Sequence, residues 1–379
     1  IKKGITDWNS AFEQAGFKNA VQVHDFTDSL DHDGDDLKYS VLTYDASEKA
    51  NAMGPSVLDP RTGEILEADI IWWHNVQSLI REWIMVQTAA TDPRARTLNL
   101  PNELIGDAVR FVACHEVGHS LGLRHNMIAS AAYPTDSLRS RTFTDRIGGT
   151  SASIMDYARF NYIAQPGDGV RVMSPHIGAY DRMAIEWGYR WYPAGTDERK
   201  KLDDYLRAHS GKEYRYSEAQ PQRSAVDPRA LSEDLGDDAM KSARYGIANL
   251  KRIMPHLVEW TRNGDPAQTY DEASAYYSGV ISQWRLFLYH VLANVGGIYL
   301  ERSTIQEDKP AYTFVEKARQ RQAIQFLLDE VLSYPHWLFD APVSQKVLIL
   351  RSTPNGMEEQ ELAYLLRNQQ NYIPWDLLD

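Results

Sequence analysis

Three histidines at helical spacing are the side chains of this chain best suited to chemistry. Residues 115–125 read HEVGHSLGLRH. His115 and His119 are four apart, so a helix of about 3.6 residues per turn places both imidazoles on one side, where they can share a metal ion. Gly122 accepts a positive φ at little cost, so the chain can turn there and return His125 as a third ligand. Three imidazoles leave one position of a zinc ion open for water, which indicates a catalytic rather than a structural site.

An acidic side chain stands next to these ligands. Glu116 follows His115 directly and can take a proton from a water at the metal. Five fixed positions match by chance in a chain of this length on the order of once in ten thousand. A helix that begins near Asn102 or Asp107 is needed to carry the motif. The residues therefore predict hydrolysis by a water that Zn²⁺ activates, with Glu116 as the general base.

The motif resembles that of the metzincin clan of zinc endopeptidases, whose second hallmark is a methionine turn beneath the metal. This chain has the sequence SIMDY at residues 153–157, with Met155 thirty residues after His125. The resemblance implies that Met155 packs under the histidines as an apolar floor and does not bind zinc. It also implies that Tyr157 contacts the zinc or stabilises the oxyanion. A tyrosine here that forms only the wall of a pocket is the alternative.

The chain is similar, more closely, to a group of large bacterial zinc-dependent metalloproteases whose substrates are largely unassigned. The likeness includes the turn at residues 56–65, the zinc helix, the methionine turn and residues 231–238 (LSEDLGDD). The resemblance implies an exported protein, periplasmic, at the cell surface or secreted. It also implies further N-terminal regions, which agrees with a chain that begins at Ile1. A cytoplasmic location stays open, because Cys114 is the only cysteine and no intrachain disulfide can form.

We expect an α+β fold of two domains. A metzincin-like catalytic domain, with a twisted mixed sheet, the zinc helix and a closing helix, occupies residues 1–193. A linker or long excursion follows at 194–237, and a mainly helical domain at 238–379. Within the first domain the patterns predict helices at 1–16 and 174–189 and strands at 21–23, 39–44 and 64–72. In the last domain, apolar stripes predict helices at 250–260 and 281–295 and a third through Ile324, Leu327, Leu328 and Val331.

Residues 65–72 are the predicted contact with an extended substrate. By resemblance, the strand before the zinc helix is an exposed edge strand, and an exposed edge can pair with a peptide. A plain sheet strand without substrate contact is the alternative. The same resemblance implies that the segment after the methionine turn lines an apolar pocket for the side chain that follows the cut bond. The residues assigned to these two roles are Ile65, Leu66, Ala68, Ile70, Phe160 and Tyr162.

Composition limits the possible partners. The net charge of −12 disfavours nucleic acid and anionic membranes, which bind basic surfaces, and no apolar run is long enough to span a membrane. We expect a monomer that binds a peptide or protein substrate. Cys114 is expected to be a small buried hydrophobic residue and not a ligand. Residues 31–36 (DHDGDD) resemble the start of a calcium loop, but Leu42 stands where its bidentate glutamate belongs, which favours a solvated acidic turn.

The function that these patterns predict is a zinc-dependent endopeptidase. Two alternatives stay open. One is a binding or adhesion module that holds zinc without turnover, and the other is a latent protease fragment that is inactive until a missing segment is removed. An intact Glu116 favours the enzyme, because a site without turnover has no use for a general base.

Overall fold

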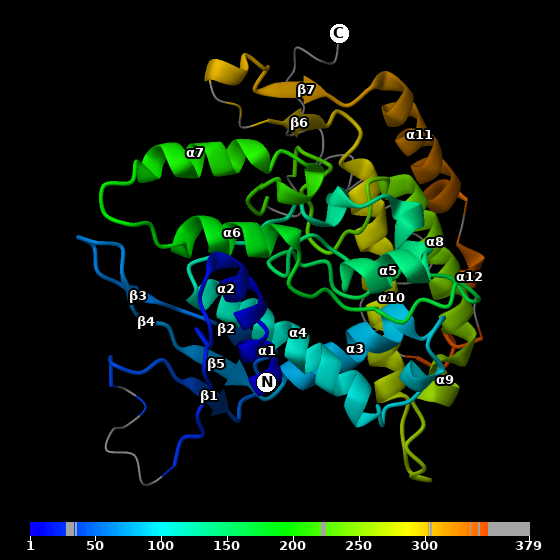
Figure 1. Ribbon diagram of the computed structural model, residues 1–379. Coiled ribbons are helices and arrows are strands. Elements are labelled where there is room, and N and C mark those ends of the chain that lie inside the picture. The colour runs from blue at the N-terminus through cyan, green and yellow to red at the C-terminus, as the bar shows by residue number, and fades with distance from the viewer. Residues whose placement is uncertain are drawn as a thin grey trace.

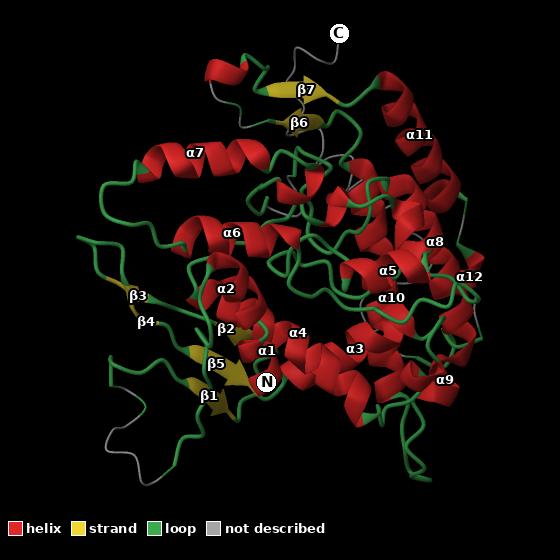
Figure 2. Ribbon diagram, viewed as in Figure 1, coloured by secondary structure: helices red, strands yellow, loops and turns green. Residues whose placement is uncertain are grey.

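The computed structural model describes residues 1–27, 34, 36–220, 225–301, 303, 305–333, 335–339 and 342–347. Helices form most of the body, while the strands gather at one side and in one distant hairpin (Figures 1 and 2). The predicted α+β fold is confirmed. Residues 31–36 fall almost entirely outside the described residues, so the choice between a calcium loop and an acidic turn stays a prediction.

A small mixed sheet contacts helix α4, which carries the histidine motif. Its strand order is β1-β5-β2, with β5 parallel to β1 and antiparallel to β2. β2 is short because Pro55 follows it closely and has no N–H to extend the ladder. A separate hairpin joins β3 to β4 through the predicted turn, where Gly63 has a φ of 77°. The bounds are Leu42–Asp45 (β1), Ala52–Met53 (β2), Val57–Leu58 (β3), Ile65–Glu67 (β4) and Ile70–Trp73 (β5).

Two strand predictions are wrong, one in part and one entirely, and side-chain hydrogen bonds explain both. The segment 64–72 splits into β4 and β5, because the N–H of Ala68 donates to Ser40 Oγ and the carboxylate of Asp69 accepts from the N–H of Val41. Residues 21–23 form no strand. The N–H and C=O of Val21 bond instead to the side chain of Asn9, which replaces a partner strand.

Helix α1 packs on α4, and the second N-terminal helix, α2, packs on α6. The predicted helix at 1–16 divides into α1 (Lys2–Thr6) and α2 (Asn9–Ala15), and Gly16 ends α2 with a φ of 102°. Between them, Trp8 is fully buried and its Nε1 donates to the carbonyl of Cys114 at 2.9 Å. The closing helix α6 (Ala179–Tyr189) packs on α2 and begins later than its predicted start at residue 174. The other helices before residue 209 are α3 (Val76–Thr88), α4 (Asn102–Ser120), α5 (Arg141–Ile147) and α7 (Glu198–Ala208).

The helices after residue 238 pack against α3. α8 (Ala239–Ile253) and α10 (Asp271–Leu292) contact each other and α3, and one cluster of buried side chains extends from Trp8 to Val347. The division into two domains at residue 194 remains a prediction. The first two apolar stripes are buried, but in the third Ile324 and Leu328 are exposed, whereas Phe326 and Leu327 face the core. The remaining elements are α9 (Leu257–Trp260), β6 (Ile298–Leu300), β7 (Tyr312–Phe314), α11 (Lys317–Leu327), α12 (His336–Phe339) and short turns of 3-10 or π-helix.

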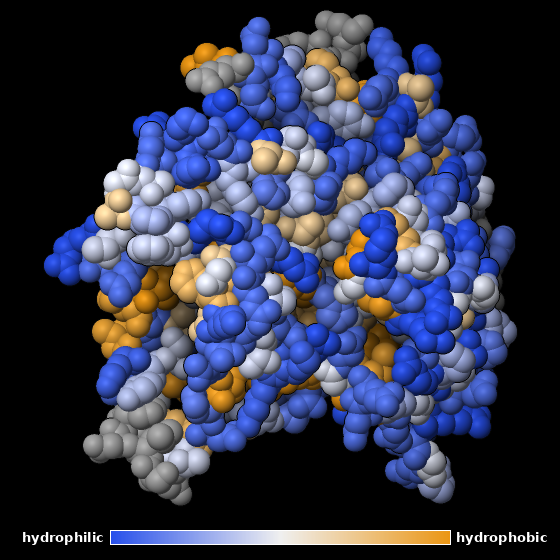
Figure 3. Space-filling model, viewed as in Figure 1, coloured by the Kyte–Doolittle hydropathy of each residue, from blue (hydrophilic) through white to orange (hydrophobic). Residues whose placement is uncertain are grey.

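The surface is largely hydrophilic, with apolar side chains gathered over the β3–β4 hairpin, where Val57, Leu58 and Leu66 are exposed (Figure 3). Among the described residues, no helix combines the length and the apolar character that crossing a bilayer demands.

Candidate active site

Helix α4 carries two of the three histidines and ends where the third must return. The helix stops at Ser120, and Gly122 takes up a left-handed conformation with a φ of 86°. The N–H groups of Gly122 and Leu123 donate back to the carbonyls of His119 and Gly118, which closes the helix end. The chain then reverses and brings His125 opposite the helix, so the predicted role of Gly122 is confirmed.

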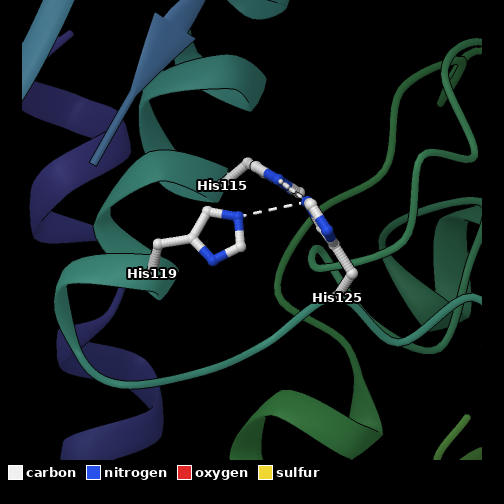
Figure 4. A group of neighbouring side chains, drawn as sticks. All are labelled: His115, His119 and His125. Atoms are coloured by element: carbon white, nitrogen blue, oxygen red, sulfur yellow. Dashed lines mark hydrogen bonds between the residues drawn. The ribbon is translucent and has the colours of Figure 1, made fainter. Parts of the chain in front are cut away.

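The three imidazoles converge on one point. The Nε2 atoms of His115 and His125 lie 3.3 Å apart, and those of His119 and His125 lie 3.2 Å apart (Figure 4). All three side chains offer a ligand atom within 4.8 Å of one another. Among the described residues, this is the one group of three or more histidine, cysteine or carboxylate side chains close enough to hold a metal ion together.

Backbone carbonyls set the orientation of two of the rings. His115 Nδ1 lies 2.8 Å from the carbonyl oxygen of Ile154, and His119 Nδ1 lies 2.9 Å from that of Leu123. A carbonyl can only accept, so each Nδ1 donates and each Nε2 keeps its lone pair for a metal. Burial lowers the pKa of all three histidines, that of His125 to about 4, so the rings are neutral at pH 7.

This donor set fits Zn²⁺. A tetrahedral zinc ion with Zn–N bonds of about 2.0–2.1 Å separates its ligand nitrogens by about 3.3–3.4 Å, close to the two observed separations. Cys114 adjoins His115 in sequence but is buried, and burial raises the pKa of its thiol. A thiol that holds its proton is a poor zinc ligand, which agrees with the prediction that Cys114 does not bind the metal.

Glu116 lies in the same buried region. Burial raises the pKa of its carboxyl to about 7. A hydrogen bond from the backbone N–H of Gly54 and the positive charge of Arg159 both lower this pKa, but burial has the larger effect. Gly54 follows strand β2 and passes so close to α4 that a Cβ there would lie 2.8 Å from the carbonyl oxygen of Glu116. A glycine at this position therefore lets the strand end reach the acid. A carboxyl with a pKa near neutrality can both accept and return a proton.

The segment of Met155 lies directly beneath α4. Met155 is fully buried, and a Cβ added to Gly118, between the two helical ligands, would collide with its Sδ. Asp181 of α6 anchors this segment: its carboxylate accepts from Ile154 N–H at 2.7 Å and from Ser153 Oγ at 2.6 Å. Because Ile154 also accepts from His115, the anchor extends to the ligand itself.

Tyr157 stands against the histidines. Its ring centroid lies 4.4 Å from that of His125 and 5.2 Å from that of His115. On another side the guanidinium of Arg159 lies 4.5 Å from the Tyr157 ring centroid. Burial raises the pKa of the phenol, and the charge of Arg159 opposes this rise. The phenol therefore keeps its proton and can serve as a hydrogen-bond donor.

The residues predicted to contact substrate along the strand are only partly accessible. The edge-strand prediction is wrong for Ile70, because β5 is the middle strand of its sheet and both its backbone edges are paired. Ala68 is buried, and Ile65 approaches Gly122. Leu66 is exposed on the β3–β4 hairpin. Among the described strands of this sheet, β2 is the outer antiparallel strand next to α4, and it pairs only with β5.

The two predicted pocket residues are part of the core. Phe160 is buried against Phe111. Tyr162 is buried against Phe287, and its hydroxyl accepts from the N–H of Leu235. Side chains enclosed in this way offer no open surface to a substrate, so their burial does not support the predicted pocket.

Sequence reasoning missed three residues that shape the site, namely Gly54, Arg159 and Asp181. Two of these residues are distant in sequence from their partners. Gly54 is more than 25 residues from Glu116, and Asp181 is more than 25 residues from Ile154. A glycine before a proline and an aspartate in the first turn of a helix are ordinary turn and capping signals. They gave no indication of a position next to a metal site.

Comparison with known proteins adds one finding. Residues 97–379 match a family described as Met-zincin, a span that covers well over half of the chain and includes the three histidines, Met155 and Tyr157. No curated protein and no solved structure matches the chain.

Proposed function

The chain belongs to the Met-zincin family, and on that premise we propose that it is an endopeptidase that hydrolyses peptide bonds at its three-histidine site, with Glu116 as the general base. The observation that carries this proposal is the convergence of three neutral imidazoles beside a buried carboxyl whose pKa is about 7. A site that only held zinc would gain nothing from that carboxyl.

Zn²⁺ bound by His115, His119 and His125 would supply a water of lowered pKa and polarise the scissile carbonyl. Glu116 takes the proton of the attacking water and then passes it to the nitrogen of the leaving amine. The phenol of Tyr157 donates a hydrogen bond to the oxygen that becomes negative. Tyr157 lies against the ring of His125, and Glu116 follows the ligand His115 directly in the sequence of α4.

An extended peptide is the substrate that the strands favour. The outer edge of β2 ends at Gly54, beside Glu116, so a peptide that pairs with β2 would pass across the three histidines. This assignment replaces the contact predicted for residues 65–72. From the resemblance alone, we propose further that the protein is an exported bacterial enzyme.

Glu116→Ala is the decisive variant. The purified chain, supplied with zinc, is incubated with a diverse peptide mixture, and new peptide ends are identified by mass spectrometry with and without a chelator. We expect chelator-sensitive cleavage by the wild type. We expect Glu116→Ala to retain zinc and to lose cleavage by about 10²–10⁴-fold, the usual contribution of a general base.

Glu103→Ala is the matched control, because Glu103 is an exposed glutamate in the first turn of the same helix. It should cleave as the wild type does. Unchanged cleavage by Glu116→Ala would refute the proposed mechanism. A wild type that binds zinc stoichiometrically but cleaves nothing would instead favour the binding module.

A further inference from the structure

A buried ion pair lies behind Tyr157. Arg159 Nη2 lies 3.1 Å from Glu233 Oε1, and the two side chains are only 14% and 21% exposed. The guanidinium carbon of Arg159 lies 3.9 Å from the ring centroid of Trp83 and 4.5 Å from that of Tyr157. Two aromatic rings and one carboxylate therefore contact a single cation.

Both partners of this ion pair have an unfavourable backbone conformation. Arg159 has a φ of 53° and Glu233 a φ of 65°, in the left-handed region that side chains with a Cβ rarely adopt. Such a conformation costs on the order of 1–2 kcal/mol per residue. Strained residues of this kind concentrate at functional sites, where the surrounding structure holds them in place.

The ion pair has further costs. Arg159 Nε is buried and has no hydrogen-bond partner. Removing two charges from water often costs more free energy than their attraction returns, so a buried ion pair is weak evidence for a stabilising role. Stability alone therefore does not account for this arrangement. The contacts that Arg159 makes with other residues indicate its role instead.

Arg159 is the link between this ion pair and the metal site. The ring of Tyr157 contacts the guanidinium of Arg159 as well as the imidazoles of His125 and His115. A cation over an aromatic ring is attracted to its negative face, which favours one position of the ring. The phenol must be held in this way if its O–H is to point at a substrate oxygen, since a donor that must reorganise stabilises the transition state less.

We propose that Arg159 is a positioning residue which, held by Glu233 and Trp83, fixes Tyr157 so that its hydroxyl donates to the oxyanion of the cleaved peptide bond. The inference rests on the proposed function, because it assigns a role within that reaction. In this role Arg159 acts through Tyr157 and is assigned no contact of its own with the substrate or the metal. Its contribution should appear in the chemical step and not in substrate binding.

The test is a double-mutant cycle between Arg159→Met and Tyr157→Phe, with kcat, KM and zinc content measured for each protein. Methionine is unbranched at Cβ, as arginine is, so the substitution removes the cation without adding to the backbone cost. We expect Arg159→Met to lower kcat about tenfold, or about 1.4 kcal/mol, with little change in KM or zinc content. In the Tyr157→Phe background, which lacks the hydroxyl, Arg159→Met should lower kcat no further.

Arg139→Met is the matched control. Arg139 pairs with Asp168 and lies 4.6 Å from the ring centroid of Tyr245, so it makes the same two kinds of contact away from the histidines. We expect its kcat to equal that of the wild type. Glu233→Gln keeps the guanidinium and removes its charged partner, and it should lower kcat in the same direction. It replaces Arg159→Met in the cycle if that variant does not fold.

Three results would overturn the inference. They are a wild-type kcat for Arg159→Met, an equal loss of kcat with and without the Tyr157 hydroxyl, and a loss of bound zinc that accounts for the whole effect. Failure of the proposed function is distinguishable, because the wild type itself would then cleave no peptide. In that case the role of Arg159 is refuted together with the reaction.

Discussion

Two glycines of helix α4 allow the contact between the zinc helix and Met155 to be measured. Gly118 lies between His115 and His119, and a Cβ there would collide with Met155 Sδ and lie 2.9 Å from Trp8 Cζ2. Gly106 lies just over three turns earlier in the same helix, and nothing would be within 4 Å of its Cβ. Replacing each glycine by alanine therefore adds the same methyl group once against the buried floor and once into open space.

The expected free energies follow from two opposing effects. Alanine in place of glycine within a helix stabilises the folded state by about 0.5–1 kcal/mol. An extra methyl group in a filled core costs about 1–3 kcal/mol. Gly106→Ala shows only the first effect and should be more stable than the wild type. Gly118→Ala shows both, so the two variants should differ by about 1–3 kcal/mol in their free energy of unfolding.

Denaturant unfolding of the metal-free proteins measures this difference, and competition with a zinc indicator measures the dissociation constant for zinc. We expect Gly118→Ala to bind zinc more weakly as well, because a displaced Met155 also displaces Ile154, which orients His115. Gly106→Ala should keep the wild-type affinity. Equal stabilisation by both alanines, with equal zinc affinities, would show that α4 does not rest on Met155 and would refute this packing.

Two further predictions concern the metal and a buried acid pair. Zinc at about 100 times its dissociation constant should stabilise the protein by about 2.7 kcal/mol. A chelator should remove this stabilisation, and the same thermal shift in His125→Ala would contradict the ligand assignment. Asp156 and Asp234 both accept from Ser130. Burial raises the pKa of each carboxyl, and the charge of Asp156 raises the pKa of Asp234 further. Because the folded-state pKa values are raised, the protonated pair contributes its full stability below the unfolded-state pKa near 4. This contribution is lost as pH rises through the folded-state pKa values. Asp234→Asn, which does not ionise, should therefore unfold at a higher temperature than the wild type, and this difference should grow from pH 5 to pH 9. A difference that stays constant with pH would contradict the raised pKa values of the pair.

The metal ligands were predictable because their geometry is local. Helical spacing fixes the relation of His115 to His119, and one glycine turn returns His125 within six residues of the second ligand. The position of Met155 came from resemblance, since thirty residues separate it from His125 and no periodicity connects them. The α+β class followed from the apolar stripes and the short β-branched runs.

The strand and pocket predictions that the structure does not support depend on partners that are distant in sequence. A run such as 64–72 has strong strand formers whether it lies at the edge or in the middle of a sheet, and its place depends on where β1 and β2 pair. Val21 is a strand former whose backbone groups Asn9 satisfies instead. Phe160 and Tyr162 are apolar enough for a pocket wall or a core, and only the packing of α4 and α10 on them decides which.

The same distinction between local and distant partners explains how the site is held. The motif places the ligand nitrogens near one another, but an imidazole binds a metal well only when its ring orientation is fixed. For His115 that orientation comes from Ile154, whose N–H donates to Asp181, and Asp181 also accepts from the N–H of Gly178 at the start of α6. Burial raises the pKa of Asp181 to about 6 despite these hydrogen bonds, which means that the buried carboxylate is costly. A buried acid that costs stability and reaches a metal ligand through one residue, Ile154, is best explained by the orientation it gives that ligand. The closing helix is therefore a part of the metal site, although it contributes no ligand.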